Sequence, residues 1–140
     1  AIHQPVLNLL CVGDNQTTML NDRPVRMRDV DSLAQATLLV TDARAVGTYQ
    51  NQAGFERLMK QAGLFRTWGD CWGYLLLAAG RADIMLDPIM KPWDILPLIP
   101  VVQGAGGVIT AWDGSAAVGA DSCVAAGKKL HTLVLEALNG

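Results

Sequence analysis

The sequence lacks the features that mark nucleic-acid-binding, membrane and disulfide-rich proteins. Its 11 Lys and Arg residues face 13 Asp and Glu residues, so there is no positive excess to attract nucleic acid or an acidic membrane surface. No apolar run approaches the ~20 residues that a membrane-spanning helix needs. The three cysteines, Cys11, Cys71 and Cys123, are far apart, which fits a reducing compartment and gives no zinc-type spacing. We therefore expect a cytoplasmic globular protein with no nucleic-acid or membrane partner.

Apolar residues, in contrast, are abundant. Of the 140 residues, 51% are hydrophobic and 17% are charged. This composition argues against disorder, and the length fits about one domain with a sizeable core. The chain begins at Ala1, without an initiator Met, in a segment that already has strand character. We expect this beginning to be a cut in a longer polypeptide.

Alternating apolar residues and frequent turn signals predict an antiparallel sheet in the first part of the chain. Residues 6–14 form a predicted strand, and residues 17–29 form a second strand or a hairpin around Asn21 and Asp22. We interpret residues 1–32 as the end of an antiparallel-sheet domain whose other strands are absent. From about residue 35 onward strands alternate with helices, which is typical of a layered α/β domain. Residues 33–140 form this second predicted domain.

Hydrophobic spacing places the elements of the second domain. Strands are predicted within residues 32–42, 64–68, 82–87, 107–112 and 122–127. Helices are predicted at residues 48–62, 70–79, 91–107 and 128–139. Because Pro100 lacks a backbone N–H, we expect a kink there in the third helix.

Asp94 stands near the start of the predicted helix 91–107, directly after Pro92 and Trp93. Pro is tolerated in the first turn of a helix, where amide hydrogens have no partner. A carboxylate at this place can act as the N-cap, accepting hydrogen bonds from free backbone N–H groups. The same position suits a hard cation beside a phosphate, because the helix dipole favours anions nearby. The spacing alone leaves both interpretations open.

Two further aspartates stand at comparable places. Asp70 follows Gly69 and opens the predicted helix 70–79, so it is a second candidate N-cap. Asp87 ends the predicted strand 82–87. Strand ends and helix starts meet at one edge of an open α/β sheet, where ligands usually bind. We therefore expect Asp70, Asp87 and Asp94 to converge, which would suit a metal ion or a cationic substrate.

The other polar and aromatic residues are assigned structural roles. Cys71 falls on the inner face of helix 70–79 and is expected to be inert. The four tryptophans are expected in the core rather than around a pocket. His3 and His131 are expected at the surface or in packing contacts. The glycines of residues 104–107 lack the Lys and Ser/Thr of a phosphate-binding loop, so we expect them to end a helix.

Three stretches of the sequence resemble the inositol monophosphatase superfamily. KPWDILPLIPVVQGAGGVIT looks like its C-terminal signature, a Trp-Asp pair followed by an apolar helix and a Gly-Gly turn. WGDCWGYLLLAAGRADIMLD resembles the segment before that signature, and its Gly-Asp-Cys-aromatic run is similar to the histidinol-phosphate phosphatase branch. PVLNLLCVGDNQTTMLNDRPVRMR resembles the family's strand and hairpin, with Asp22 replacing a Gly of the family pattern. The resemblance covers nearly the whole chain.

This resemblance implies a magnesium-dependent phosphomonoesterase with an αβαβα sandwich fold, of which the chain is the C-terminal half. It implies that Asp94 is a metal ligand and that Gly69, Asp70, Cys71 and Asp87 contact the substrate. An Asp at position 70 would favour a small phosphorylated substrate with an amine or imidazolium, such as histidinol phosphate of histidine biosynthesis, over neutral inositol. Many relatives are homodimers, so the resemblance also implies a homodimer.

The chain departs from the family pattern chiefly by absence. The Gly-x-Glu-Glu and Asp-Pro-Ile-Asp-Gly-Thr segments that supply most metal ligands in the family do not occur in this sequence. We therefore expect no catalytic residue within this chain, and no tight magnesium binding by Asp94 alone. Two alternatives remain open. One is an inositol monophosphatase, and the other is a non-catalytic domain that pairs with a partner through an exposed sheet edge.

Overall fold

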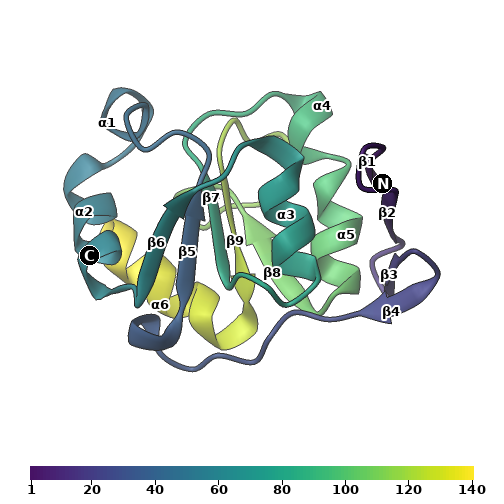
Figure 1. Cartoon of the computed structure of the whole chain (residues 1–140). Coiled ribbons are helices and arrows are strands. Elements are labelled where there is room, and N and C mark those ends of the chain that lie inside the picture. The colour runs from purple at the N-terminus through teal and green to yellow at the C-terminus, as the bar shows by residue number, and fades with distance from the viewer.

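Two β-sheets form the framework of the computed structural model, which describes residues 1–140 (Figure 1). The smaller sheet is antiparallel, with its strands in chain order: β1 (Ile2–Gln4), β2 (Leu9–Gly13), β3 (Thr18–Leu20) and β4 (Arg23–Val25). The predicted hairpin is confirmed, because Asn21 and Asp22 join β3 to β4 with the positive φ angles that a tight hairpin turn requires. The strand predicted at 6–14 is wrong at its beginning. There the Asn8 N–H donates to the Pro5 carbonyl (3.1 Å) and closes a turn between β1 and β2.

The larger sheet has the strand order β6-β5-β7-β9-β8. Its strands are β5 (Thr37–Val40), β6 (Leu64–Thr67), β7 (Ile84–Asp87), β8 (Gly107–Thr110) and β9 (Cys123–Gly127). Strands β6 and β7 pair in parallel with opposite sides of β5, whereas β9 runs antiparallel between β7 and β8. After β5, the next strand in the chain, β6, lies on one side of it, and the following strand, β7, lies on the other side. This arrangement creates a topological switch point at the carboxyl ends of β5 and β7, where open α/β sheets bind ligands.

Six α-helices and one 3₁₀ turn (η1, Leu33–Gln35) connect the strands. The helices are α1 (Val46–Tyr49), α2 (Gln52–Gln61), α3 (Asp70–Ala78), α4 (Pro92–Ile95), α5 (Leu98–Gly104) and α6 (Lys128–Asn139). Helix α6 matches the prediction for residues 128–139, and α3 matches the prediction for 70–79 within one residue. No helix has the length and apolar character that a membrane span requires.

Two predicted helices are each divided in the structure. The helix predicted at 48–62 is interrupted because Asn51 caps α2 separately, accepting a hydrogen bond from the Gly54 N–H (3.1 Å). The helix predicted at 91–107 is interrupted at Pro97, which offers no N–H to continue α4. The kink predicted at Pro100 is therefore wrong. Pro100 lies in the first turn of α5, where a missing N–H breaks no helical hydrogen bond.

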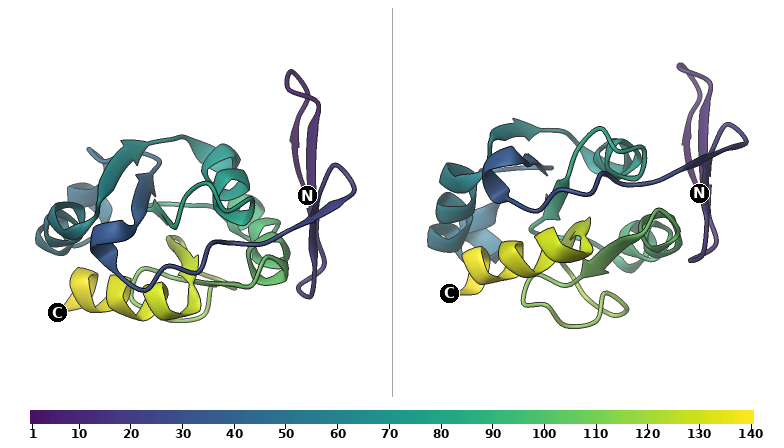
Figure 2. Two further views of the ribbon diagram at one scale, coloured as in Figure 1. Left: turned by 60° about the horizontal axis from the view of Figure 1, so that its bottom comes forward. Right: turned by 90° about the horizontal axis from the view of Figure 1, so that it is seen from below.

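The elements form alternating layers (Figure 2). Helices α2 and α6 cover one face of the larger sheet, with Phe55, Leu58 and Leu130 in the core between them. Helices α3 and α5 cover the other face, and the smaller sheet packs on their far side. The layered α/β class predicted from the sequence is confirmed. The domain boundary between residues 32 and 33 stays a prediction.

Helix α5 and the smaller sheet are in backbone contact. A Cβ atom added to Gly13 on β2 would lie 2.4 Å from the Pro100 carbonyl oxygen, so only glycine permits this approach. On the adjacent strand, the buried Thr18 hydroxyl donates to the Val101 carbonyl at 2.7 Å. The smaller sheet is thereby fixed against the helix that follows α4.

The opposite face of the smaller sheet is uncovered (Figure 2). Side chains alternate along β2, so that Cys11 is buried while Leu10 and Val12 are 46% and 45% exposed. The smaller sheet therefore presents apolar side chains on its outer face as well as on its inner face.

Candidate active site

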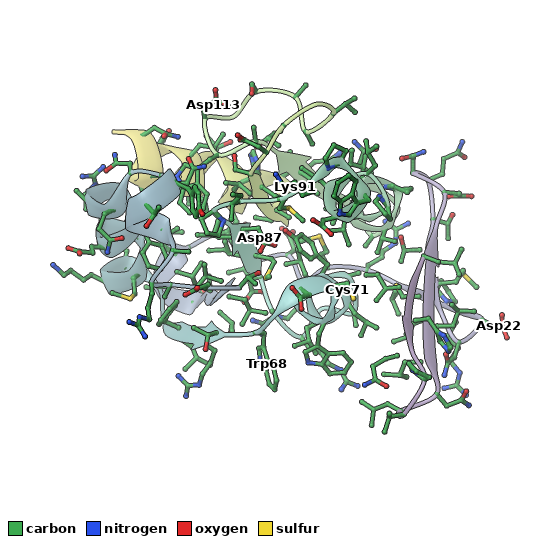
Figure 3. The ribbon with its side chains drawn as sticks, turned by 90° about the horizontal axis from the view of Figure 1, so that it is seen from above. Asp22, Trp68, Cys71, Asp87, Lys91 and Asp113 are labelled. Atoms are coloured by element: carbon green, nitrogen blue, oxygen red, sulfur yellow. The ribbon has the colours of Figure 1, made fainter.

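A pocket of about 300 Å³ opens at the carboxyl ends of β5 and β7, at the switch point of the larger sheet. Figure 3 looks onto this edge, with Asp87 near the centre of the view between Cys71 and Lys91. The pocket is lined by one hydroxyl, one thiol, three carboxylates and apolar side chains: Thr41, Cys71, Asp70, Asp87, Asp94, Ile89, Met90 and Trp93. Larger hollows elsewhere on the surface lack this set of carboxylates. The predicted convergence of the three aspartates is confirmed, since all of them line one pocket.

Asp87 is the most deeply buried of these carboxylates. It is the last residue of β7, and only 4% of it is exposed. It accepts a hydrogen bond from the Thr41 hydroxyl and another, at 2.6 Å, from the Tyr74 hydroxyl. Burial raises the pKa of Asp87 to about 6, and the charges of Asp70 and Asp94 act in the same direction, whereas the two hydroxyls oppose the shift. The Asp87 carboxylate therefore gains or loses its proton close to neutral pH.

Asp94 occupies the third position of α4. The N-cap is Lys91 and Pro92 stands at N1, so the prediction of Asp94 as N-cap is wrong. Instead, its carboxylate accepts a hydrogen bond from the backbone N–H of the N-cap residue Lys91, at 3.0 Å, and so stabilises the first turn of the helix. Only Oδ2 is used in this contact. Since Asp94 is exposed and lines the pocket, its other oxygen is free to bind a ligand there.

Residues 69–71 begin α3 at the mouth of the pocket. The prediction of Asp70 as N-cap is wrong, because Gly69 holds that position and no side chain caps the helix. Asp70 adopts a positive φ of 51°, which Asp tolerates better than most residues, and its exposed carboxylate lines the pocket. The predicted inward position of Cys71 is also wrong. Cys71 is exposed, because this first turn extends beyond the core in which Tyr74 and Leu75 are buried.

The pocket offers the kind of atom that magnesium prefers, but not a closed set of ligands. Magnesium binds carboxylate oxygens and keeps several of its waters. Nowhere in the chain do three or more His, Cys, Asp or Glu side chains come together closely enough to hold a metal ion. The free oxygen of Asp94 therefore fits one coordination position, and the rest of a magnesium site is not built from these 140 residues.

The tryptophans divide between the core and the edge of the larger sheet. Trp112 is buried, as predicted. The core assignment is wrong for Trp93, which is 73% exposed and lines the pocket, and for Trp68, which is 48% exposed. Trp68 lies in the connection after β6, and Trp93 lies in the short helix α4. Trp68 lies at the periphery of Figure 3 and makes an edge-on contact with Trp72, with ring centroids 6.5 Å apart.

Neither histidine contributes to the pocket. His3 is exposed on β1. His131 is buried in α6, its Nε2 lies 3.0 Å from the Thr110 hydroxyl, and burial lowers its pKa. The predicted surface and packing roles are confirmed.

A comparison with known families gives the identity of this architecture. The sequence model described as "Inositol monophosphatase family" matches residues 1–140. The chain belongs to the inositol monophosphatase family. Its structure agrees with that of an inositol monophosphatase from Zymomonas mobilis, with a TM-score of 0.91 and 25% identity over 99% of this chain and 56% of that one. An inositol monophosphatase from Anabaena shares the fold, with a TM-score of 0.85 at 24% identity over 98% of this chain and 56% of that one.

Curated relatives in the family include histidinol-phosphatases. A histidinol-phosphatase of Chlorobaculum parvum is 32% identical over an aligned length of 113, and the alignment covers 76% of this chain and 44% of that protein. The chloroplastic bifunctional phosphatase IMPL2 of Arabidopsis thaliana is 34% identical over an aligned length of 148, and the alignment covers 98% of this chain and 42% of that protein. The similarity to histidinol-phosphate phosphatases, predicted from the Gly-Asp-Cys run, is thus confirmed. The chain spans less than half the length of these two relatives.

Two residues of the pocket region were not found from the sequence. Thr41 falls within the predicted strand region 32–42 and Tyr74 within the predicted helix 70–79, and no functional role follows from either place. A weak signal for Thr41 exists, since a hydroxyl at the carboxyl end of a buried strand lies where such folds bind ligands. The contacts of Tyr74 and Thr41 with Asp87 join separate elements and have no local signature. The roles assigned to Asp94, Gly69, Asp70, Cys71 and Asp87 by resemblance stay predictions.

Proposed function

We propose that this chain forms the C-terminal part of a magnesium-dependent phosphomonoesterase whose substrate is histidinol phosphate. The observation that supports the proposal most directly is the pocket at the switch point. It gathers three aspartates and contains no Lys or Arg side chain in its lining. A pocket of this charge favours cationic ligands, and a phosphate ester enters it only with a cation. Membership of a phosphatase family adds the reaction class.

In this proposal Asp94 is one magnesium ligand. The carboxylate is held by the Lys91 N–H through one oxygen, so its second oxygen has a defined direction. The remaining ligands come from polypeptide outside these 140 residues, which fits the relatives' greater length. When bound, magnesium neutralises phosphate charge and lowers the pKa of a coordinated water.

Asp70 and Asp87 select the organic part of the substrate. An amine or imidazolium placed between them gains from both charges, whereas neutral inositol leaves the buried charge of Asp87 without a cationic partner. Histidinol carries an amine, which is cationic at neutral pH, and an imidazole, which becomes cationic when it is protonated. The name of the Chlorobaculum relative, a histidinol-phosphatase, points to the same substrate. The homodimer and the cytoplasmic location remain part of the proposal and rest on resemblance and composition.

The test is phosphate release by the full-length protein that contains this chain. Histidinol phosphate and inositol monophosphate are offered separately, with and without magnesium. We expect release that depends on magnesium and a higher kcat/KM for histidinol phosphate. Asp70→Asn should lower this preference about 10-fold or more, because the loss of one charged contact is worth at least that factor. Asp113→Asn, an exposed aspartate outside the pocket, is the matched control.

Each alternative predicts a different result. A preference for inositol monophosphate would favour an inositol monophosphatase. No release from either ester, with magnesium present, would favour a non-catalytic partner domain. The 140-residue chain assayed alone should release no phosphate, and magnesium-dependent release by it would overturn the claim that further ligands lie elsewhere.

A further inference from the structure

Two hydroxyl groups hold Asp87 in place, and the proposed function gives neither of them a role. Thr41 directly follows β5, and Asp87 ends the neighbouring parallel strand β7. The Thr41 hydroxyl donates to Oδ1 of Asp87, and the Tyr74 hydroxyl donates to Oδ2 at 2.6 Å. Each carboxylate oxygen accepts one hydrogen bond from inside the protein. Because such an oxygen has two acceptor directions, one on each oxygen remains for a ligand.

The position of Tyr74 is unusual for a phenol that serves only packing. Its side chain lies on α3 with 0% exposure, in the core between the two sheets. Apart from Asp87, its hydroxyl contacts only sulfur atoms, which are weak hydrogen-bond partners: Sδ of Met90, at 3.8 Å, and the buried thiol of Cys123. A phenylalanine would fill the same space without a buried polar group to satisfy. Asp87 is therefore the one strong hydrogen-bond partner of this hydroxyl.

We propose that Tyr74 and Thr41 are positioning residues that fix the Asp87 carboxylate and so set the preference for a phosphate ester with a cationic organic part. The inference rests on the proposed function, in which Asp87 contacts that part of the substrate. A carboxylate held at both oxygens does not rotate, so its free acceptor directions point to one place in the pocket. Recognition by a preorganised group avoids the loss of side-chain freedom on binding. Removing one hydroxyl keeps the negative charge of Asp87 but allows its carboxylate to rotate.

Conservative variants of the full-length protein test this role. Tyr74→Phe and Thr41→Val each remove one hydroxyl and keep the shape of the side chain. We expect each to lower the ratio of kcat/KM for histidinol phosphate to kcat/KM for inositol monophosphate about 10-fold, since one hydrogen bond to a charged group is lost. The change should fall on KM for histidinol phosphate. Thr41→Ser keeps a hydroxyl and should recover most of the ratio.

Thr18→Val is the matched control, because it removes a buried hydroxyl that binds the Val101 carbonyl away from the pocket. It should lower stability and leave the substrate ratio at the wild-type value. The positioning role is refuted if this control changes the ratio as much as Tyr74→Phe does. A wild-type ratio in both Tyr74→Phe and Thr41→Val refutes it as well.

Asp87→Asn separates failure of this inference from failure of the proposed function. If Asp87→Asn loses the preference while the two hydroxyl variants keep it, the proposed function stands and the positioning role is wrong. If Asp87→Asn keeps the preference, Asp87 does not select the organic part of the substrate, and both its role in the proposed function and the positioning role of the two hydroxyls are wrong. The same holds if the wild-type protein does not distinguish the two esters.

Discussion

Replacing Asp87 by Asn is expected to make the protein more stable at neutral pH. Burial raises the pKa of Asp87 to about 6 in the folded protein, from an ordinary value of 3.8 that applies to the unfolded chain. The stability that this group contributes is therefore fully present below pH 3.8 and is lost as the pH rises through 6. Above that range the ionised carboxylate lowers the free energy of unfolding by about 3 kcal/mol relative to its protonated form. Asparagine keeps the size of the side chain and removes this cost.

Urea unfolding of the wild type and Asp87→Asn at a series of pH values from 4 to 8 measures the effect. The difference in free energy of unfolding between the two proteins should grow with pH in favour of the variant, and level off above pH 6. Other titrating groups cancel in this difference. Asp113→Asn should show no such gain, because hydrogen bonds from Ser115 lower the pKa of that exposed carboxyl instead. A pH-independent difference, or a variant that is less stable at pH 8, would refute the assignment of a buried and destabilising charge.

Three other variants probe separate features. Arg28→Ala removes the cationic partner of Asp83, whose side chain is 1% exposed and which Arg28 contacts through two hydrogen bonds of 3.0 and 2.5 Å, and leaves the hydrogen bond from the Thr37 N–H. The uncompensated buried carboxylate should lower the free energy of unfolding by about 3–5 kcal/mol in urea titrations. Gly54→Ala places a Cβ atom 1.9 Å from the Leu138 carbonyl oxygen. The forced separation of α2 from α6 should lower stability by about 1–3 kcal/mol in thermal unfolding. Asp94→Asn should reduce magnesium-dependent phosphate release about 100-fold without loss of helix in circular dichroism, because the amide oxygen still accepts the N–H of α4's first turn.

Matched controls decide the meaning of these results. Lys129→Ala breaks an ion pair with Asp31 in which both side chains are 65% exposed, and it should change stability by less than about 1 kcal/mol. An equal effect of Lys129→Ala and Arg28→Ala would show that burial of Asp83 is not the cause. Gly69→Ala adds a Cβ with no atom within 4 Å and should be neutral for stability. Full phosphatase activity in Asp94→Asn would remove Asp94 from the metal site.

Local signals in the sequence predicted much of the fold. Helix α6 was predicted from its apolar spacing, and the hairpin between β3 and β4 from Asn21 and Asp22, two residues that tolerate positive φ. Two of the failed predictions concern helix starts that the sequence does mark. Asn51 is a good N-cap in the middle of a helical pattern, and Pro92 marks the first position of α4, which excludes Asp94 from the N-cap.

The candidate site was only partly predictable. Asp87 and Asp94 could be placed at one sheet edge, since parallel strands end there and helices begin there. The exposure of Cys71 could not be predicted from the apolar spacing of its helix. That spacing assigns a residue to one side of the helix, but it does not show how far along the helix the neighbouring layer extends. The hydrogen bonds from Tyr74 and Thr41 to Asp87 depend on three elements meeting in space. No periodicity within any one of them contains that information.

The contact between α5 and the smaller sheet has a consequence for inherited and engineered variation. Only two residues separate α4, which carries Asp94, from α5, and α5 is held against β2 where Gly13 meets the Pro100 carbonyl. A side chain at position 13 would displace α5 and, with it, the aspartate proposed to bind magnesium. A loss-of-function substitution in this protein can therefore lie in a strand that contributes no atom to the pocket, and its defect would be one of metal affinity.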